Sequence, residues 1–88
     1  MNWVYELADD AEQELRKFPQ AIQRNIVNTL IRSQSDPFQG DVIALHGSKH
    51  DKIFRRRIGN YRILFVPDYE KRLISVLHIS LRSEKTYR

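Results

Sequence analysis

The chain has 88 residues, of which 41% are hydrophobic and 30% charged, and its formal net charge is +4. This length corresponds to one domain with a small hydrophobic core, and the composition is typical of a folded protein rather than a disordered one. The sequence contains no cysteine, which excludes disulfide bonds, zinc sites built from thiolates and thiol nucleophiles.

The chain shows no targeting segment and a clear asymmetry of charge. Residues 1–6 lack the basic and apolar regions of a signal peptide, and no apolar run approaches the ~20 residues of a membrane span. We therefore expect a cytoplasmic protein that is not bound to a membrane. From the absence of cysteine we also expect no metal chemistry, and we expect no cofactor. Basic residues gather after residue 48 and acidic residues favour the first 14, which indicates a polyanion or an acidic protein as the partner.

The first half of the chain has a helical pattern after one short strand. The aromatic and branched run Trp3–Leu7 predicts the strand. Asp9 or Asp10 is suited to cap a helix that Pro19 breaks. Pro19 also suits the first turn of a second helix, which Asp36-Pro37 ends, so the two helices form a hairpin.

The second half of the chain has an extended pattern. Residues 42–46 are short and apolar, the runs 53–58 and 61–66 flank a Gly59-Asn60 turn, and residues 73–82 form the last strand. These elements predict an α+β fold, in which an amino-terminal strand and a two-helix hairpin pack on a mainly antiparallel, twisted sheet. The chain has no visible linker or repeat, so residues 1–88 are predicted to form a single domain.

The central hairpin concentrates four arginines around its turn. With a two-residue loop, Arg57 pairs directly with Arg62, and alternate residues share a face. The core face is predicted to carry Phe54, Arg56, Ile58, Tyr61, Ile63 and Phe65, and the other face Ile53, Arg55, Arg57, Arg62, Leu64 and Val66. Crowded like charges cost stability when nothing negative lies on them, so the second face is a candidate site for an anion. Arg56, on the core face, is interpreted as a snorkelling edge residue.

The last strand is expected to complete this surface. Its more apolar set is predicted to face the core: Leu73, Ser75, Leu77, Ile79 and Leu81. The alternate set would place His78, Ser80 and Arg82 beside Arg55, Arg57 and Arg62 on the other face. A slip of one residue would exchange the two sets.

The hairpin sequence Phe54-Arg-Arg-Arg-Ile-Gly-Asn-Tyr-Arg62, followed by Ile79-Ser-Leu-Arg82 and by Tyr87-Arg88, resembles the RelE/ParE superfamily of type II toxins. Members of this superfamily commonly read aromatic-Arg-x-Arg-apolar-Gly-x-Tyr-Arg in the hairpin. The resemblance extends over essentially the whole chain and implies a single toxin domain of RelE/ParE-like fold.

The RelE-like branch of the resemblance implies a ribonuclease that cuts mRNA in the ribosomal A site, by attack of a ribose 2′-hydroxyl on the adjacent phosphate. Arg62 then matches the arginine that stabilises the transition state, Arg55 a basic residue of the catalytic face, Arg82 the late arginine and Tyr87 the terminal tyrosine. The implied partners are a cognate antitoxin, in a hetero-oligomeric complex, and ribosome-bound mRNA with contacts to 16S rRNA.

The residue chemistry fits these roles in part. Guanidinium groups are charged, planar and bidentate, which suits a phosphorane, and nearby arginines would favour the phenolate of Tyr87 as a proton acceptor. The proton donor to the leaving oxygen stays open between Arg82 and His78, because arginine is a weak acid. Arg57, Lys52 and His78 are expected to bind the substrate.

Two positions depart from the RelE-like pattern. Ile53 stands where some RelE-like enzymes have lysine, with Lys52 beside it, and Leu81 stands where many relatives have histidine.

Two other functions remain open. A ParE-like protein would use the same scaffold to inhibit DNA gyrase without catalysis. A third alternative is an inert or nucleic-acid-binding relative, whose arginines contact phosphates. Separately, the alternative for Tyr87 is a frayed terminal aromatic, and that for His78 is a structural strand residue.

Overall fold

The computed structural model describes residues 2–45 and 52–81. The elements follow each other along the chain as β1 (Val4–Leu7), α1 (Asp9–Arg16), α2 (Gln20–Arg32), β2 (Val42–Leu45), β3 (Ile53–Ile58), β4 (Tyr61–Asp68) and β5 (Leu73–Leu81).

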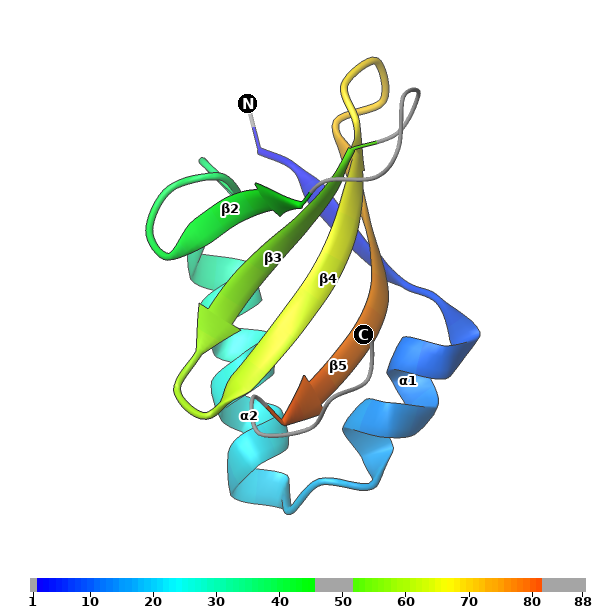
Figure 1. The fold of residues 1–88 in the computed structure, drawn as a ribbon, viewed down its shortest axis with the longest axis vertical. Coiled ribbons are helices and arrows are strands. Elements are labelled where there is room, and N and C mark those ends of the chain that lie inside the picture. Colours follow the sequence, from blue (N-terminus) through cyan, green and yellow to red (C-terminus); the bar gives the residue numbers. More distant parts are fainter. Residues whose placement is uncertain (1, 46–51, 82–88) are drawn as a thin grey trace.

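Within the described residues, five strands form one sheet in the order β1-β5-β4-β3-β2. β1 runs parallel to β5, and the other neighbouring strands are antiparallel. In Figure 1, α2 runs behind the sheet and α1 lies beside β5. Two helices thus pack on a mixed, mainly antiparallel sheet, which confirms the predicted α+β fold.

The helix boundaries differ slightly from those predicted. The N-cap of α1 is Ala8, which makes no side-chain capping bond, so the predicted cap at Asp9 or Asp10 is wrong. Both aspartates lie instead in the first turn, where their carboxylates interact favourably with the positive end of the helix dipole. α2 ends at Arg32, before the predicted stop at Asp36-Pro37, because its last carbonyls accept hydrogen bonds from the turn that follows.

The hairpin formed by β3 and β4 has the predicted register. Ile58 pairs with Tyr61, and Arg57 pairs with Arg62. Gly59 has a φ of +57°, whereas Asn60 is not among the non-glycine residues with positive φ. A positive φ at the first but not the second central residue is the pattern of a type II′ turn, in which glycine avoids the steric cost of a Cβ.

β5 contains an irregularity that the alternating pattern does not predict. Leu64 pairs with His78, but its neighbour Phe65 pairs with Val76, so Leu77 is an extra residue in β5. Such a bulge exchanges the two faces of a strand at the point where it occurs. Before it, Ile74 and Val76 are buried, which contradicts the predicted core set of Leu73, Ser75 and Leu77.

After the bulge, the predicted faces hold. Ile79 is buried and pairs with Ile63, while Ser80 pairs with Arg62 on the other face. The bulge therefore lets both halves of β5 bury branched side chains, although these are separated by an odd number of residues. Leu81, expected in the core, is exposed.

The hydrophobic core lies between the sheet and the helices. Its buried members are Trp3, Ala11, Leu15, Ile26, Leu30, Ile58, Ile63, Phe65, Ile74, Val76 and Ile79. Phe38, in the loop after α2, extends the core with an edge contact to Trp3 at 5.6 Å and a second to Phe54 at 5.2 Å between ring centroids. This packing fixes which face of β3, β4 and β5 turns away from the helices.

Candidate functional site

The candidate site is the face of β3, β4 and β5 that points away from the core. The register places Arg57 opposite Arg62 and Arg62 opposite Ser80 on this face, with Arg55 opposite Leu64 and Leu64 opposite His78. We call this surface the arginine face, defined by Arg55, Arg57, Arg62, His78 and Ser80. The strand pairing thus confirms that these five predicted residues share one face of the sheet.

The arginines of this face differ in exposure. The side chain of Arg55 is only 7% exposed, whereas that of Arg57 is 45% exposed. Arg62 is half-buried. Arg57 is therefore the guanidinium most open to an incoming anion, and Arg55 acts on the site mainly through its charge.

Asp41, which the sequence pattern did not single out, supplies a negative charge to this face. Its Oδ1 lies 3.5 Å from Nη2 of Arg55, and its Oδ2 lies 4.0 Å from Nη1 of Arg57. The backbone carbonyl of Asp41 also accepts a hydrogen bond from the N–H of Arg57, at 3.1 Å. The signal in the sequence was an acidic residue directly before β2, the strand that pairs with the arginine-bearing β3.

His78 makes a contact that the sequence pattern did not indicate. Its Nδ1 lies 3.4 Å from Oε2 of Glu14 on α1. Oε1 of the same carboxylate accepts a hydrogen bond from the backbone N–H of Ile79, at 2.9 Å. His78 therefore belongs to the arginine face by register, while its ring contacts α1 at the edge of the sheet.

Three predicted site residues remain, and the structure describes only one of them. Lys52 is exposed and lies directly before β3. Arg82 and Tyr87 lie outside the described residues, so their predicted places beside the arginine face stay predictions.

Arg56 lies on the core face, as predicted, but it is buried rather than snorkelling. Its Nη2 donates hydrogen bonds to the carbonyls of Pro37 and Gln39, both at 2.8 Å. A buried guanidinium is tolerable where its donors meet acceptors, and here it ties β3 to the loop that leads into β2. Arg56 therefore has a structural role inside the fold, and its interpretation as a snorkelling edge residue is wrong.

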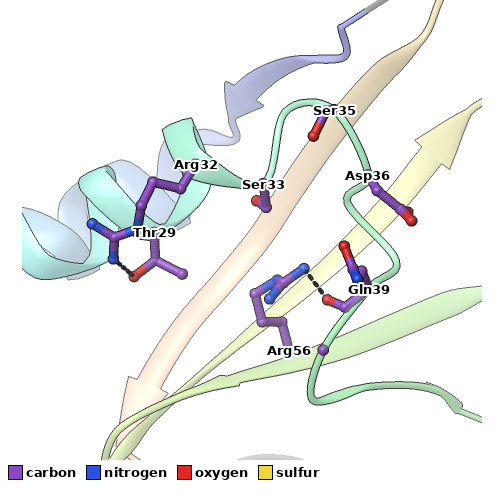
Figure 2. A pocket seen from close by; sticks show the side chains of 8 residues that line it. Thr29, Arg32, Ser33, Ser35, Asp36, Gln39 and Arg56 are labelled. Carbon is purple, nitrogen blue, oxygen red and sulfur yellow. Dashed lines mark hydrogen bonds between the residues drawn. The ribbon is translucent and has the colours of Figure 1, made fainter.

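A shallow pocket of about 200 Å³ opens beside Arg56, on the helix side of the sheet (Figure 2). It is lined by Thr29, Arg32, Ser33, Ser35, Asp36, Gln39, Gly40 and Arg56. Nearby, burial raises the pKa of the Tyr5 hydroxyl, while its hydrogen bond to Ser33 and the charge of Arg56 oppose this shift. The pocket and the arginine face lie on opposite sides of the sheet.

The described part of the chain brings together no three His, Asp or Glu side chains that could hold a metal ion. None of the helices in that part is both long enough and apolar enough to cross a bilayer.

Searches with protein-family models and against curated protein sequences find no match for this chain. Solved structures do match it. The archaeal RelE–RelB complex from Pyrococcus horikoshii OT3 contains a chain with a TM-score of 0.80 and 22% identity, and the match covers 96% of this chain and 99% of that one. The toxin–antitoxin complex RelBE2 from Mycobacterium tuberculosis matches with a TM-score of 0.81 and 22% identity, over 93% and 100% of the two chains.

The isolated RelE toxin from E. coli matches with a TM-score of 0.72 and 17% identity, over 96% of this chain and 88% of that one. Similarity at such low identity is evidence for a shared architecture. Over nearly its whole length, this chain has the fold of the RelE toxin structures.

Proposed function

We propose that the protein is the toxin of a type II toxin–antitoxin system, and that it is an endoribonuclease that cleaves mRNA in the ribosomal A site. The observation that carries this proposal is the arginine face, where Arg57 and Arg62 lie directly opposite each other beside Arg55. Like charges held together by the backbone are costly without an anion, and a phosphate matches the bidentate geometry of guanidinium groups. The RelE-like fold supports the same assignment.

In the proposed reaction, the 2′-hydroxyl oxygen of a ribose attacks the adjacent phosphorus. The bond from phosphorus to the 5′-oxygen breaks, which leaves a 2′,3′-cyclic phosphate and a 5′-hydroxyl. Negative charge grows on the equatorial oxygens during attack, and Arg62 would stabilise it with donors that are already charged and oriented. Arg57 and Lys52, both exposed, would bind the RNA phosphates on either side of the cleaved bond. Arg55, which is buried, would contribute its positive charge without direct contact.

Two protons must move in this reaction. Tyr87 would accept the proton of the 2′-hydroxyl, if it lies beside the arginine face as the resemblance implies, since nearby arginines favour a phenolate. The 5′-oxygen would receive a proton from Arg82 or His78, and His78 is the better acid of the two in its cationic form. The roles of Tyr87 and Arg82 rest on the resemblance of the terminal residues to RelE-like toxins.

The proposed partners follow from the same surface. A cognate antitoxin would present carboxylates to the arginine face and keep RNA away from it, in a hetero-oligomeric complex. The ribosome would supply the substrate mRNA and contacts to 16S rRNA, whose phosphates suit a chain with a net charge of +4. With these partners, the protein would act in the cytoplasm.

The test is to map the 5′ ends of cellular mRNA after brief induction of the protein. We expect new ends within translated codons for the wild type, and loss of these ends for Arg62→Ala. Arg24→Ala is the matched control, because it removes the same charge from an exposed position on α2, on the other side of the sheet. Tyr87→Phe should also abolish the new ends.

The alternatives give different results in the same cells. Growth arrest with intact mRNA, together with inhibition of DNA supercoiling by purified gyrase, would replace the proposal with a ParE-like function. RNA binding that weakens with salt, without cleavage or gyrase inhibition, would indicate a nucleic-acid-binding relative.

A further inference from the structure

Asp41 places a single carboxylate within reach of two arginines of the arginine face. Oδ1 lies 3.5 Å from Arg55 and Oδ2 lies 4.0 Å from Arg57, so each carboxylate oxygen lies near a different guanidinium. The backbone carbonyl of Asp41 accepts a hydrogen bond from Arg57, and the next residue, Val42, begins the strand that pairs with β3. The main chain of Asp41 is thus fixed beside Arg57, from where the carboxylate reaches both arginines.

The carboxylate of Asp41 offsets the cost of burying the positive charge of Arg55. The Arg55 side chain is 7% exposed, and its Nε has no hydrogen-bond partner among the described residues. A buried guanidinium without an opposite charge is strongly unfavourable, and a further positive charge, that of the exposed Arg57, lies two residues along the same strand face. Of the described carboxylates, that of Asp41 is the one that pairs with these arginines.

The geometry also leaves the arginines able to bind a phosphate. Separations of 3.5 and 4.0 Å are long for hydrogen-bonded ion pairs. A guanidinium has five N–H donors, so one distant carboxylate does not use them up. Asp41 is also 54% exposed, so its own charge is partly screened by water and repels an incoming phosphate only weakly.

We infer that Asp41 is a positioning residue, which holds Arg55 and Arg57 in fixed orientations so that a phosphate meets a preorganised pair of guanidinium groups. This inference rests on the proposed function for its catalytic consequence. The preorganisation itself is a property of the folded chain and can be measured without any substrate. Asp41 would act through the arginines and would not touch the reacting atoms.

The first measurement is a thermal double-mutant cycle on Asp41 and Arg55. We expect Asp41→Asn to lower the Tm by roughly 4 °C in the wild-type background, which corresponds to the loss of one moderate interaction in a domain of this size. In the Arg55→Met background, the same substitution should change the Tm by less than about 1 °C, because the nearer and more buried partner of Asp41 is gone and the exposed pair with Arg57, at 4.0 Å, contributes little. Equal shifts in both backgrounds would refute the coupling and overturn the inference.

The second measurement is cleavage of mRNA on purified, programmed ribosomes. Asp41→Asn should lower kcat by roughly 10-fold, since misplacing a group by about 1 Å costs up to ~10²-fold. Its KM should stay the same or fall, because the variant is one charge more positive toward RNA. Asp41→Glu should restore much of the kcat, since it restores the carboxylate. Glu70→Gln is the matched control, with the same change of charge at an exposed position in the turn before β5.

The two measurements separate failure of the inference from failure of the proposed function. Cleavage by the wild type with an unchanged kcat for Asp41→Asn would overturn the inference alone. Absence of cleavage by the wild type would overturn the proposed function, while the thermal cycle would still decide whether Asp41 positions the arginines. A higher kcat for both Asp41→Asn and Glu70→Gln would reveal a general effect of charge and would also overturn the inference.

Discussion

Glu14 on α1 accepts a hydrogen bond at 2.9 Å from the backbone N–H of Ile79 on β5, 65 residues further along the chain. β1 covers this edge of β5 only as far as Val76, where the N–H of Ala8 donates to the Val76 carbonyl. Beyond that point, the carboxylate of Glu14 continues the pairing that a longer β1 would have provided. A helix side chain therefore satisfies a backbone donor on a part of the β5 edge that β1 does not reach.

Glu14→Ala should destabilise the fold by about 1.5 kcal/mol, because hydrogen bonds to charged groups contribute about 1.5–3 kcal/mol and this one is partly exposed. Glu14→Gln keeps an acceptor oxygen and should lose about a third of that. Urea denaturation monitored by circular dichroism measures both values. Gln13→Ala, at an exposed neighbouring position, is the control and should change the stability by less than about 0.5 kcal/mol. Equal effects at Glu14 and Gln13 would show that the carboxylate does not stabilise the strand edge.

Arg56→Met should lower the free energy of unfolding much more than the replacement of an exposed arginine would. It removes two hydrogen bonds from a buried guanidinium and leaves the carbonyls of Pro37 and Gln39 without this donor, at a cost of about 3 kcal/mol. The loss should appear as a lower urea midpoint, and α2 and the sheet should unfold together. Arg24→Met, at an exposed position on α2, should leave the midpoint within experimental error. If both variants behave alike, Arg56 does not fasten the loop.

Stability should fall at alkaline pH because of Tyr5. Burial raises the pKa of this hydroxyl above its usual value of about 10, so the unfolded chain loses the proton first as the pH rises. The stabilising contribution of the neutral phenol is therefore complete below about pH 10 and is lost as the pH rises through the folded-state pKa. Urea midpoints from pH 8 to 11 should fall more steeply for the wild type than for Tyr5→Phe. Tyr69→Phe, which alters an exposed tyrosine, should keep the wild-type slope.

The hairpin was predictable from sequence because its determinants are local. Gly59 permits the positive φ of the turn, and a two-residue loop then fixes the pairing of Arg57 with Arg62 without further information. The shared face of the arginines follows from that register alone. For the same reason, the crowding of positive charge on this face can be inferred from the order of the residues.

The bulge in β5 was not predictable because its cause is tertiary. Strict alternation along residues 73–81 gives a plausible apolar set, but the core accepts Ile74 and Val76 before Leu77, and Ile79 after it. β5 packs against α1 and β1, and these contacts are not encoded in the alternation along the strand. Asp41 and Glu14 were missed for a related reason: each acts on residues that lie far away in the sequence, and neither belongs to a recognisable motif.

Arg57→Gln should leave the free energy of unfolding nearly unchanged while it weakens the proposed activity. The substitution removes a like-charge pair with Arg62 across the strands, which relieves about 0.2–1 kcal/mol of repulsion. It also removes an exposed ion pair with Asp41 at 4.0 Å, which contributes a similarly small amount. The two terms nearly cancel, so the free energy of unfolding should change by less than about 0.5 kcal/mol.

The same variant should nevertheless weaken the proposed activity, because Arg57 is the most exposed guanidinium of this face and would carry a phosphate contact. We expect kcat/KM for mRNA on the ribosome to fall by roughly 10-fold, which corresponds to about 1.4 kcal/mol of lost transition-state binding. The salt dependence of binding should also become shallower, by about one phosphate contact. Arg24→Gln removes the same charge away from the face and should preserve both quantities. A large loss of stability in Arg57→Gln would instead assign this arginine to the fold, and unchanged cleavage would remove it from the substrate site.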